Sequence, residues 1–186
     1  MCNRPMESAK IVVLSITSAV IYGVLHDQIT ARVCVEYFTI GHPQIIRTDS
    51  PTLLAILWGV IATWWVGLLL GVPAAVLSRF GSWPKYTARM LLRSIVVLSL
   101  FMGCASFVMG IVGYLLAAAG CVWLVEPLAS MVPESKHNLF LADLWAHGAA
   151  YGVGFFGGLV VLCVVAVNRS QMAAKEVELS GIAPYR

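Results

Sequence analysis

The chain has 186 residues, of which 60% are hydrophobic and only 11% are charged, and its formal net charge is +3. Globular domains carry about 25% charged residues, so this composition excludes an ordinary water-soluble domain and indicates a membrane protein. No basic run with interleaved aromatic residues is present, and the positive excess therefore predicts no nucleic-acid partner.

Four long apolar stretches predict four transmembrane helices. They run approximately over residues 9–25, 52–77, 94–122 and 141–167. A helix needs about 20 apolar residues to cross the hydrocarbon core, which the last three stretches exceed and the first reaches only with residues 29–35. Backbone groups in lipid must be paired within the protein, and these stretches lack the alternation of barrel strands. We predict an all-α membrane protein, a single four-helix transmembrane domain over residues 1–186 that crosses the plasma or inner membrane and has the lipid bilayer as its surroundings.

Lys and Arg gather on one side of this predicted topology. If the connecting segments alternate across the membrane, nine of the twelve lie with the N-terminus: Arg4, Lys10, Arg79, Lys85, Arg89, Arg93, Arg169, Lys175 and Arg186. The positive-inside rule then places both termini in the cytoplasm and the longer loop, between the first and second helices, outside. All four histidines fall on the outer side: His26, His42, His137 and His147.

Residues 26–43, which follow the first apolar stretch, are dense in groups that can bind a metal or move a proton. We predict a helical continuation of the first span at the membrane interface, with a strand as the alternative. In a helix, Arg32 and Glu36 are four residues apart and can form an ion pair. A turn at residues 41–43 should end this segment, with His42 on the turn.

The second helix has a clear start signal, because Ser50 can cap it and Pro51 suits the first helical position. Pro73 should kink it. Residues 82–84 (Ser-Trp-Pro) repeat the start signal before the third helix. Trp64 and Trp65 lie too deep for an interfacial belt and should line a cavity or face lipid.

The third helix should open with a basic stripe, since Lys85, Arg89 and Arg93 are spaced four apart. The stripe can anchor the helix to the cytoplasmic leaflet or bind an anionic lipid specifically, and we favour anchoring. The apolar run is longer than a membrane requires, and Gly120 is a candidate break point. Residues 168–186 are predicted to form a short cytoplasmic tail, helical at first and frayed at residues 180–184.

Small residues mark one face of the third helix and recur in the fourth: Ser99, Gly103, Ser106, Gly110 and Gly113, then Gly148, Gly152, Gly154, Gly157 and Gly158. In lipid, close backbone approach through small residues holds helices together. We favour packing of these two helices within one chain. A seam between copies of the chain is the alternative, and the glycines of the fourth helix can also leave room for a lipid tail or a quinone.

Asp143 and His147 are four residues apart and share a face of the fourth helix, which should look into the bundle because a carboxylate in contact with lipid is costly. Together with residues from the first outer loop they form a pool of candidate ligands: His26, Asp27, Glu36, His42, Asp143 and His147. Imidazole and carboxylate ligands suit zinc, iron, copper or manganese. Without a metal, the same groups can relay protons or bind a transported ion, or they can be ordinary residues of solvated loops.

Three functional hypotheses follow from these features. The glycine faces favour a small membrane component that assembles with itself or with another membrane protein. The acid and histidine groups favour a membrane enzyme or metal-binding protein with its site at the outer interface. The third hypothesis is a transporter or channel subunit, although the two halves of the chain show no repeat.

Overall fold

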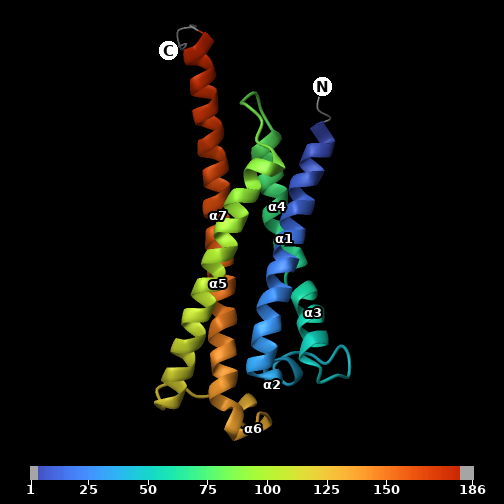
Figure 1. Ribbon diagram of the computed structural model, residues 1–186, viewed down its shortest axis with the longest axis vertical. Helices are drawn as coiled ribbons and strands as arrows, with labels where there is room; N and C mark the ends of the chain where they lie inside the picture. Colours follow the sequence, from blue (N-terminus) through green and yellow to red (C-terminus); the bar gives the residue numbers. More distant parts are fainter. Residues whose placement is uncertain (1–3, 181–186) are drawn as a thin grey trace.

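The protein is a bundle of long helices in the computed structural model, which describes residues 4–180 and the side chains from residue 6 onward. Of the described residues, 81% are helical and none lies in a strand. The elements are α1 (Arg4–Val33), α2 (Val35–Thr39), α3 (Pro51–Ile61), α4 (Trp64–Arg79), α5 (Ala88–Ala118), α6 (Leu128–Met131), the 3-10 turn η1 (Glu134–Lys136) and α7 (His137–Ser180) (Figure 1). Cys2, Arg186 and the frayed end predicted beyond residue 180 lie outside the described residues.

Four helical segments are long and apolar enough to cross a membrane: Met6–Val33, Pro51–Arg79, Ala88–Ala118 and Glu134–Ser180. The predicted all-helical membrane fold is therefore confirmed at this level. The longest helix, α7, has 44 residues and a length of about 66 Å, so it extends well beyond a hydrocarbon core of about 30 Å. It continues past Val167 to the last described residue, which agrees with the helical extension predicted after the fourth span.

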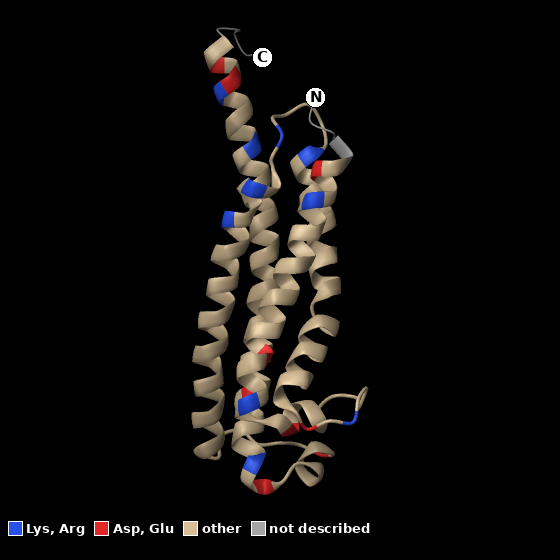
Figure 2. Cartoon of the chain, turned by 45° about the vertical axis from the view of Figure 1, so that its right-hand side comes forward, with Lys and Arg blue, Asp and Glu red and all other residues tan. Residues whose placement is uncertain are grey.

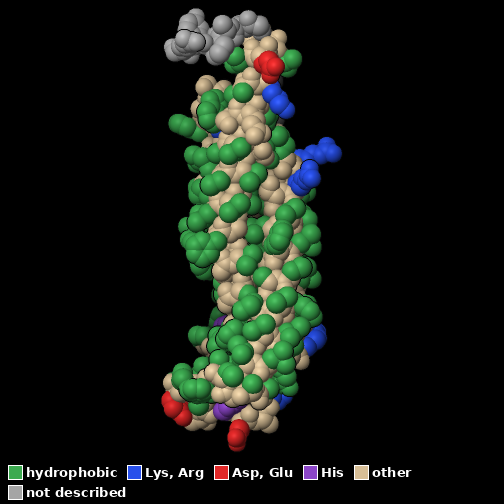
Figure 3. Space-filling view, turned by 90° about the vertical axis from the view of Figure 1, so that its left-hand side faces the viewer, with side chains coloured by type: hydrophobic (Ala, Val, Ile, Leu, Met, Phe, Trp, Pro, Cys, Tyr) green, Lys and Arg blue, Asp and Glu red, His purple; other side chains and the backbone are tan. Residues whose placement is uncertain are grey.

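The outside of the bundle is apolar along its middle and charged at its ends. Large hydrophobic side chains such as Phe107, Leu100 and Val160 are exposed, as lipid contact requires. Figure 3 shows hydrophobic side chains covering the middle of one face. Figure 2 shows most Lys and Arg at the end of the bundle where the described chain starts and finishes, and most Asp and Glu toward the opposite end.

The second span is interrupted at a point that the sequence did not predict. α4 continues through Pro73, and the break lies at Ala62 and Thr63. The Thr63 hydroxyl donates to the Gly59 carbonyl oxygen, while the Thr63 N–H turns to the Val60 oxygen at 3.3 Å. A side chain that competes for a helical carbonyl in this way loosens the turn.

Glycine sets the distance between α1 and the interrupted second span. A Cβ on Gly59 would lie 2.5 Å from the backbone nitrogen of Val24, and a Cβ on Gly67 would lie 2.6 Å from Cα of Ile16. No side chain fits in this space, so the backbones pack directly against each other.

The predicted packing of the third and fourth spans within one chain is also present, since α5 and α7 pair along much of their length (Figure 1). Gly113 lies under Trp145, whose Cγ would be 2.6 Å from an added Cβ. Gly103, Gly148 and Gly152 take no part, because a Cβ on any of them would meet nothing within 4 Å.

Two charged side chains fasten the loop between α4 and α5. Arg169 of α7 is only 5% exposed and donates to the carbonyl oxygens of four loop or helix-end residues: Leu77, Phe80, Trp83 and Pro84. A Glu7 carboxylate oxygen accepts from the Ala88 N–H, the first of α5, at 3.1 Å. Both side chains satisfy backbone groups that a helix end leaves unpaired.

The start of α5 differs from the prediction. Thr87, rather than Ser82, caps the helix and accepts from the Met90 N–H at 3.4 Å. Lys85 therefore precedes the helix, and its ammonium group donates to the Gly81 carbonyl, so the predicted three-residue stripe keeps only Arg89 and Arg93. At the other end the prediction is confirmed, because Gly120 adopts φ of 70° just after α5 stops at Ala118.

Candidate functional site

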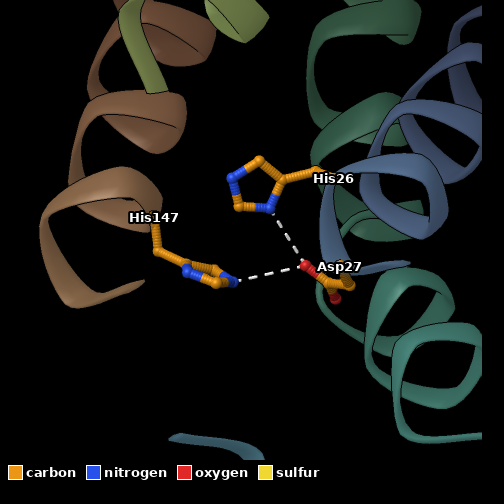
Figure 4. A group of neighbouring side chains, drawn as sticks. All are labelled: His26, Asp27 and His147. Atoms are coloured by element: carbon orange, nitrogen blue, oxygen red, sulfur yellow. Dashed lines mark hydrogen bonds and ion pairs between the residues drawn. The ribbon is translucent and has the colours of Figure 1, made fainter. Parts of the chain in front are cut away.

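Three of the six candidate residues meet inside the bundle. His26 and Asp27 lie in the last two turns of α1, and His147 reaches them from α7 (Figure 4). Oδ1 of Asp27 lies 3.1 Å from Nδ1 of His26 and 3.3 Å from Nε2 of His147. One atom from each of the three side chains lies within 4.8 Å of the others, which is close enough for a shared metal ion. We refer to these three residues as the His/Asp/His group.

The hydrogen bond on the far side of His147 determines where its proton lies. Nδ1 is 2.8 Å from the Asp143 carbonyl oxygen, which can only accept, so Nδ1 carries a hydrogen. In the neutral ring, Nε2 then presents a lone pair to the carboxylate oxygen of Asp27. Two acceptors facing each other at 3.3 Å repel unless a proton or a metal cation lies between them.

His26 has a comparable partner on its other nitrogen. Its Nε2 lies 2.7 Å from the Ser106 hydroxyl oxygen, and Ser106 is buried on the face of α5 that turns toward α1. If Nε2 donates to Ser106, the lone pair of Nδ1 points to Asp27. Histidines that bind metals usually donate their second N–H to an oxygen acceptor in this manner, and both histidines have such an acceptor.

The group is buried at a depth where polar side chains are costly. The exposed fractions of its side chains are 9% for His26, 8% for Asp27 and 6% for His147. All three lie in segments apolar enough to span a membrane. Ionisable groups in such a position are candidates for a functional site, because hydrophobic residues would give a more stable bundle.

Asp143 lies one helical turn before His147, but its carboxylate is not part of the group. The residue is 1% exposed, and its Oδ2 has no hydrogen-bond partner among the described residues. It therefore adds a second buried acid beside the group. His147 is held by the Asp143 backbone oxygen and not by its carboxylate.

His42 approaches the group without joining it, because the Tyr37 ring lies between. Tyr37 stacks on His147 with ring centroids 4.5 Å apart and contacts His42 at 5.0 Å. Nδ1 of His42 donates to the Tyr37 carbonyl oxygen at 2.9 Å, because a carbonyl oxygen can only accept. Burial lowers the pKa of His42 and raises that of the Tyr37 hydroxyl, so both side chains stay neutral near pH 7.

Glu36 lies away from the group. One carboxylate oxygen is 3.9 Å from the Lys136 ammonium, and the other accepts from the Cys34 thiol at 3.4 Å. Burial raises the pKa of that thiol to about 12, so it stays protonated. The predicted Arg32–Glu36 ion pair is wrong: Arg32 instead donates to Gln28 and to the Thr52 hydroxyl.

The predicted local structure of this segment is otherwise close to the structure. α1 continues to Val33, α2 covers Val35–Thr39, and His42 follows on the turn. His137, the first residue of α7, contacts the Val132 carbonyl oxygen at 2.9 Å.

Two apolar spaces border the group. A groove of about 730 Å³ runs between α1 and α5 and includes His26, Ser106 and Asp143 in its walls. A cavity of about 450 Å³ lies among α1, α4, α5 and α7, and the whole His/Asp/His group lines it. Tyr22 and His26 border both spaces, so they form part of the wall between them.

Sequence reasoning missed three residues around the group. Tyr22 and Tyr37 stack on the two histidines, and Ser106 holds His26. Ser106 appeared only as one of the small residues of its helix. Its hydroxyl was a signal as well, since a buried hydroxyl in a transmembrane helix needs a partner.

Comparison of the chain with protein-family models, with curated proteins and with solved structures finds no match.

Proposed function

We propose that this chain is a multi-pass membrane metalloprotein whose transition-metal ion is held by His26, Asp27 and His147. The observation that carries the proposal is the lone pair of His147 Nε2, which faces Asp27 Oδ1 at 3.3 Å while Nδ1 is held as a donor. A metal cation between two such acceptors turns a repulsive contact into two bonds.

The distances are also compatible with a metal ion between these atoms. A hydrogen bond between a charged imidazole and a carboxylate is typically about 2.7–2.9 Å long, shorter than either contact to Asp27. Two ligands of a tetrahedral ion with bonds of about 2.0–2.1 Å lie about 3.3 Å apart. The contacts of 3.1 and 3.3 Å are close to that spacing.

The ligand set fits zinc, iron, copper or manganese. Three protein ligands leave at least one position of the metal open, as in hydrolytic zinc sites and in iron sites with two histidines and one carboxylate. There the metal would polarise a substrate oxygen or activate a bound water.

Metal content of the purified protein tests the proposal. We expect about one ion per chain after expression with each of the four metals in turn, and loss of that ion in Asp27→Asn and His147→Ala. His137→Ala is the matched control, because His137 lies outside the group. Asp143→Asn should also keep its metal. A wild-type protein without metal, or equal loss in His137→Ala, would refute the proposal.

We further propose that the end of the bundle with both termini is cytoplasmic, which places the His/Asp/His group toward the outer leaflet. The excess of Lys and Arg at that end supports this orientation. Cys121, exposed in the loop after α5, is a natural reporter. A membrane-impermeant maleimide added to intact cells should label it, and labelling only after lysis would reverse the orientation.

A second role, self-association, is favoured by one observation. Gly148 and Gly152 are four apart on α7, and a Cβ at either position would meet nothing within 4 Å. Such a pair lets helices of two molecules approach closely. Native mass spectrometry should show oligomers that Gly152→Ile disrupts and Gly103→Ile on α5 does not, whereas a monomer at every concentration would exclude this role.

A further inference from the structure

The cavity that ends at the His/Asp/His group is long and narrow. On α7 its lining runs from His147 to Leu162, a helical length of about 22 Å. Spread over that length, the volume of about 450 Å³ leaves a cross-section of about 20 Å². That cross-section suits one extended hydrocarbon chain.

The walls change character along the cavity. The His/Asp/His group lies at one end, and the side chains of Leu98, Met102 and Leu70 line the part beyond it. Sites for small molecules commonly combine such an apolar body with a few convergent polar groups. An occupant should therefore be apolar along its length and polar at one tip.

The polar tip includes a carboxylate oxygen that neither histidine contacts. Both histidine contacts end on Oδ1 of Asp27, and Oδ2 points away from them in Figure 4. A hydroxyl group can donate to such an oxygen and can also coordinate a metal through its own oxygen. An alcohol or a similar oxygen-bearing head satisfies both requirements.

The cavity is also open to lipid. Trp65 and Leu69 of α4 and Phe155 of α7 line it and are 50%, 54% and 47% exposed on the outside of the bundle. A molecule dissolved in the membrane can reach the interior past these side chains without passing through water. Trp65 thus lines the cavity and is also exposed on the outside of the bundle, so both alternatives from the sequence apply to it.

We infer that this cavity holds the single hydrocarbon chain of a lipid whose oxygen-bearing head lies at the His/Asp/His group. The inference rests on the proposed function in one respect only, namely that the head meets a metal ion at this group. The chain itself is bound by the apolar walls whether or not the metal is present.

Photolabelling tests the inference directly. The probe is hexadecanol with a diazirine in its chain and a terminal alkyne, added to the full-length protein in phospholipid nanodiscs. We expect labelled peptides to contain Leu98 and Met102, although two-chain phospholipid is present in large excess. Unlabelled hexadecanol should compete, and hexadecane, which lacks the head, should not.

Two variants form a matched pair. Ala150 lines the cavity one turn from His147, and Ala150→Leu should lower this labelling about tenfold because its side chain occupies the same space. Gly103→Leu adds the same bulk in the neighbouring groove and should leave the labelling unchanged. The competition experiment uses wild-type protein, so it decides the matter even if Ala150→Leu fails to fold.

Label found only on outward-facing residues such as Phe107, or equal competition by hexadecane, would overturn the inference. A metal-loaded protein that shows no labelling at Leu98 or Met102 would overturn it while leaving the proposed function intact. Head-dependent labelling of a protein that binds no metal would support the inference and refute the proposed function.

Discussion

Removing the Ser106 hydroxyl should weaken metal binding without removing a ligand. Ser106 is 4% exposed, and its oxygen lies 2.7 Å from Nε2 of His26. In Ser106→Ala that nitrogen loses its acceptor, so the ring is less firmly oriented and less basic at Nδ1. Loss of such an outer partner typically lowers metal affinity about 10–100-fold. This corresponds to about 1.4–2.7 kcal/mol.

A competition titration against a chromophoric chelator measures this change on purified protein in detergent. Ser106→Ala should bind as much metal as wild type at saturation but with weaker affinity. Ser99→Ala is the control, since Ser99 lies two turns earlier on α5 and borders the same spaces without a hydrogen bond to either histidine. A metal affinity of Ser106→Ala within about twofold of wild type would refute the role of Ser106 as the hydrogen-bond partner that orients His26.

Three further predictions concern stability. Arg169→Ala should lower the melting temperature markedly, because buried hydrogen bonds from a charged group are worth about 1.5–3 kcal/mol each, whereas the exposed Arg89→Ala should change it little. Gly59→Ala should destabilise the bundle by forcing α1 and α3 apart, whereas Gly103→Ala should be neutral or stabilising. Equal effects of the two substitutions in thermal unfolding would contradict the packing described for Gly59. Burial lowers the pKa of His42 in the folded protein, so acidification below about pH 6.5 protonates the unfolded state first and reduces stability. In His42→Gln the melting temperature should therefore fall less between about pH 7 and pH 5. An unchanged pH profile would show that another group is responsible.

The helices could be predicted from the sequence because hydrocarbon demands long apolar runs, and their ends followed local rules in most places. Ser50 caps α3 by accepting from the Leu53 N–H, as expected. The break at Thr63 was missed because it depends on a hydroxyl competing for a carbonyl. That competition has no signature in hydropathy.

Packing between helices was predicted where small residues formed a repeated face and missed where they did not. The pairing of α5 with α7 followed from such a face. Gly23 and Gly59 are isolated in the sequence, and only the structure shows that each makes room for the backbone of the other's helix. Contacts between distant segments depend on how each helix is rotated about its own axis, and a single apolar stripe does not determine that rotation.

The sequence predicted the types of residue in the candidate site but not which of the six candidates come together. Rotation of α1 turns Asp27 inward to His147, whereas Glu36 turns to Lys136 and His42 packs against Tyr37. All of these residues were plausible ligands by spacing alone. Their separation is a property of the assembled bundle.

X-ray absorption at the metal edge of the loaded protein tests the central claim most directly. The account predicts scattering from two imidazoles and from oxygen at about 2.0–2.2 Å, with the signal of one imidazole lost in His147→Ala. Sulfur at about 2.3 Å, a third imidazole, or a wild-type spectrum that His147→Ala leaves unchanged would contradict it.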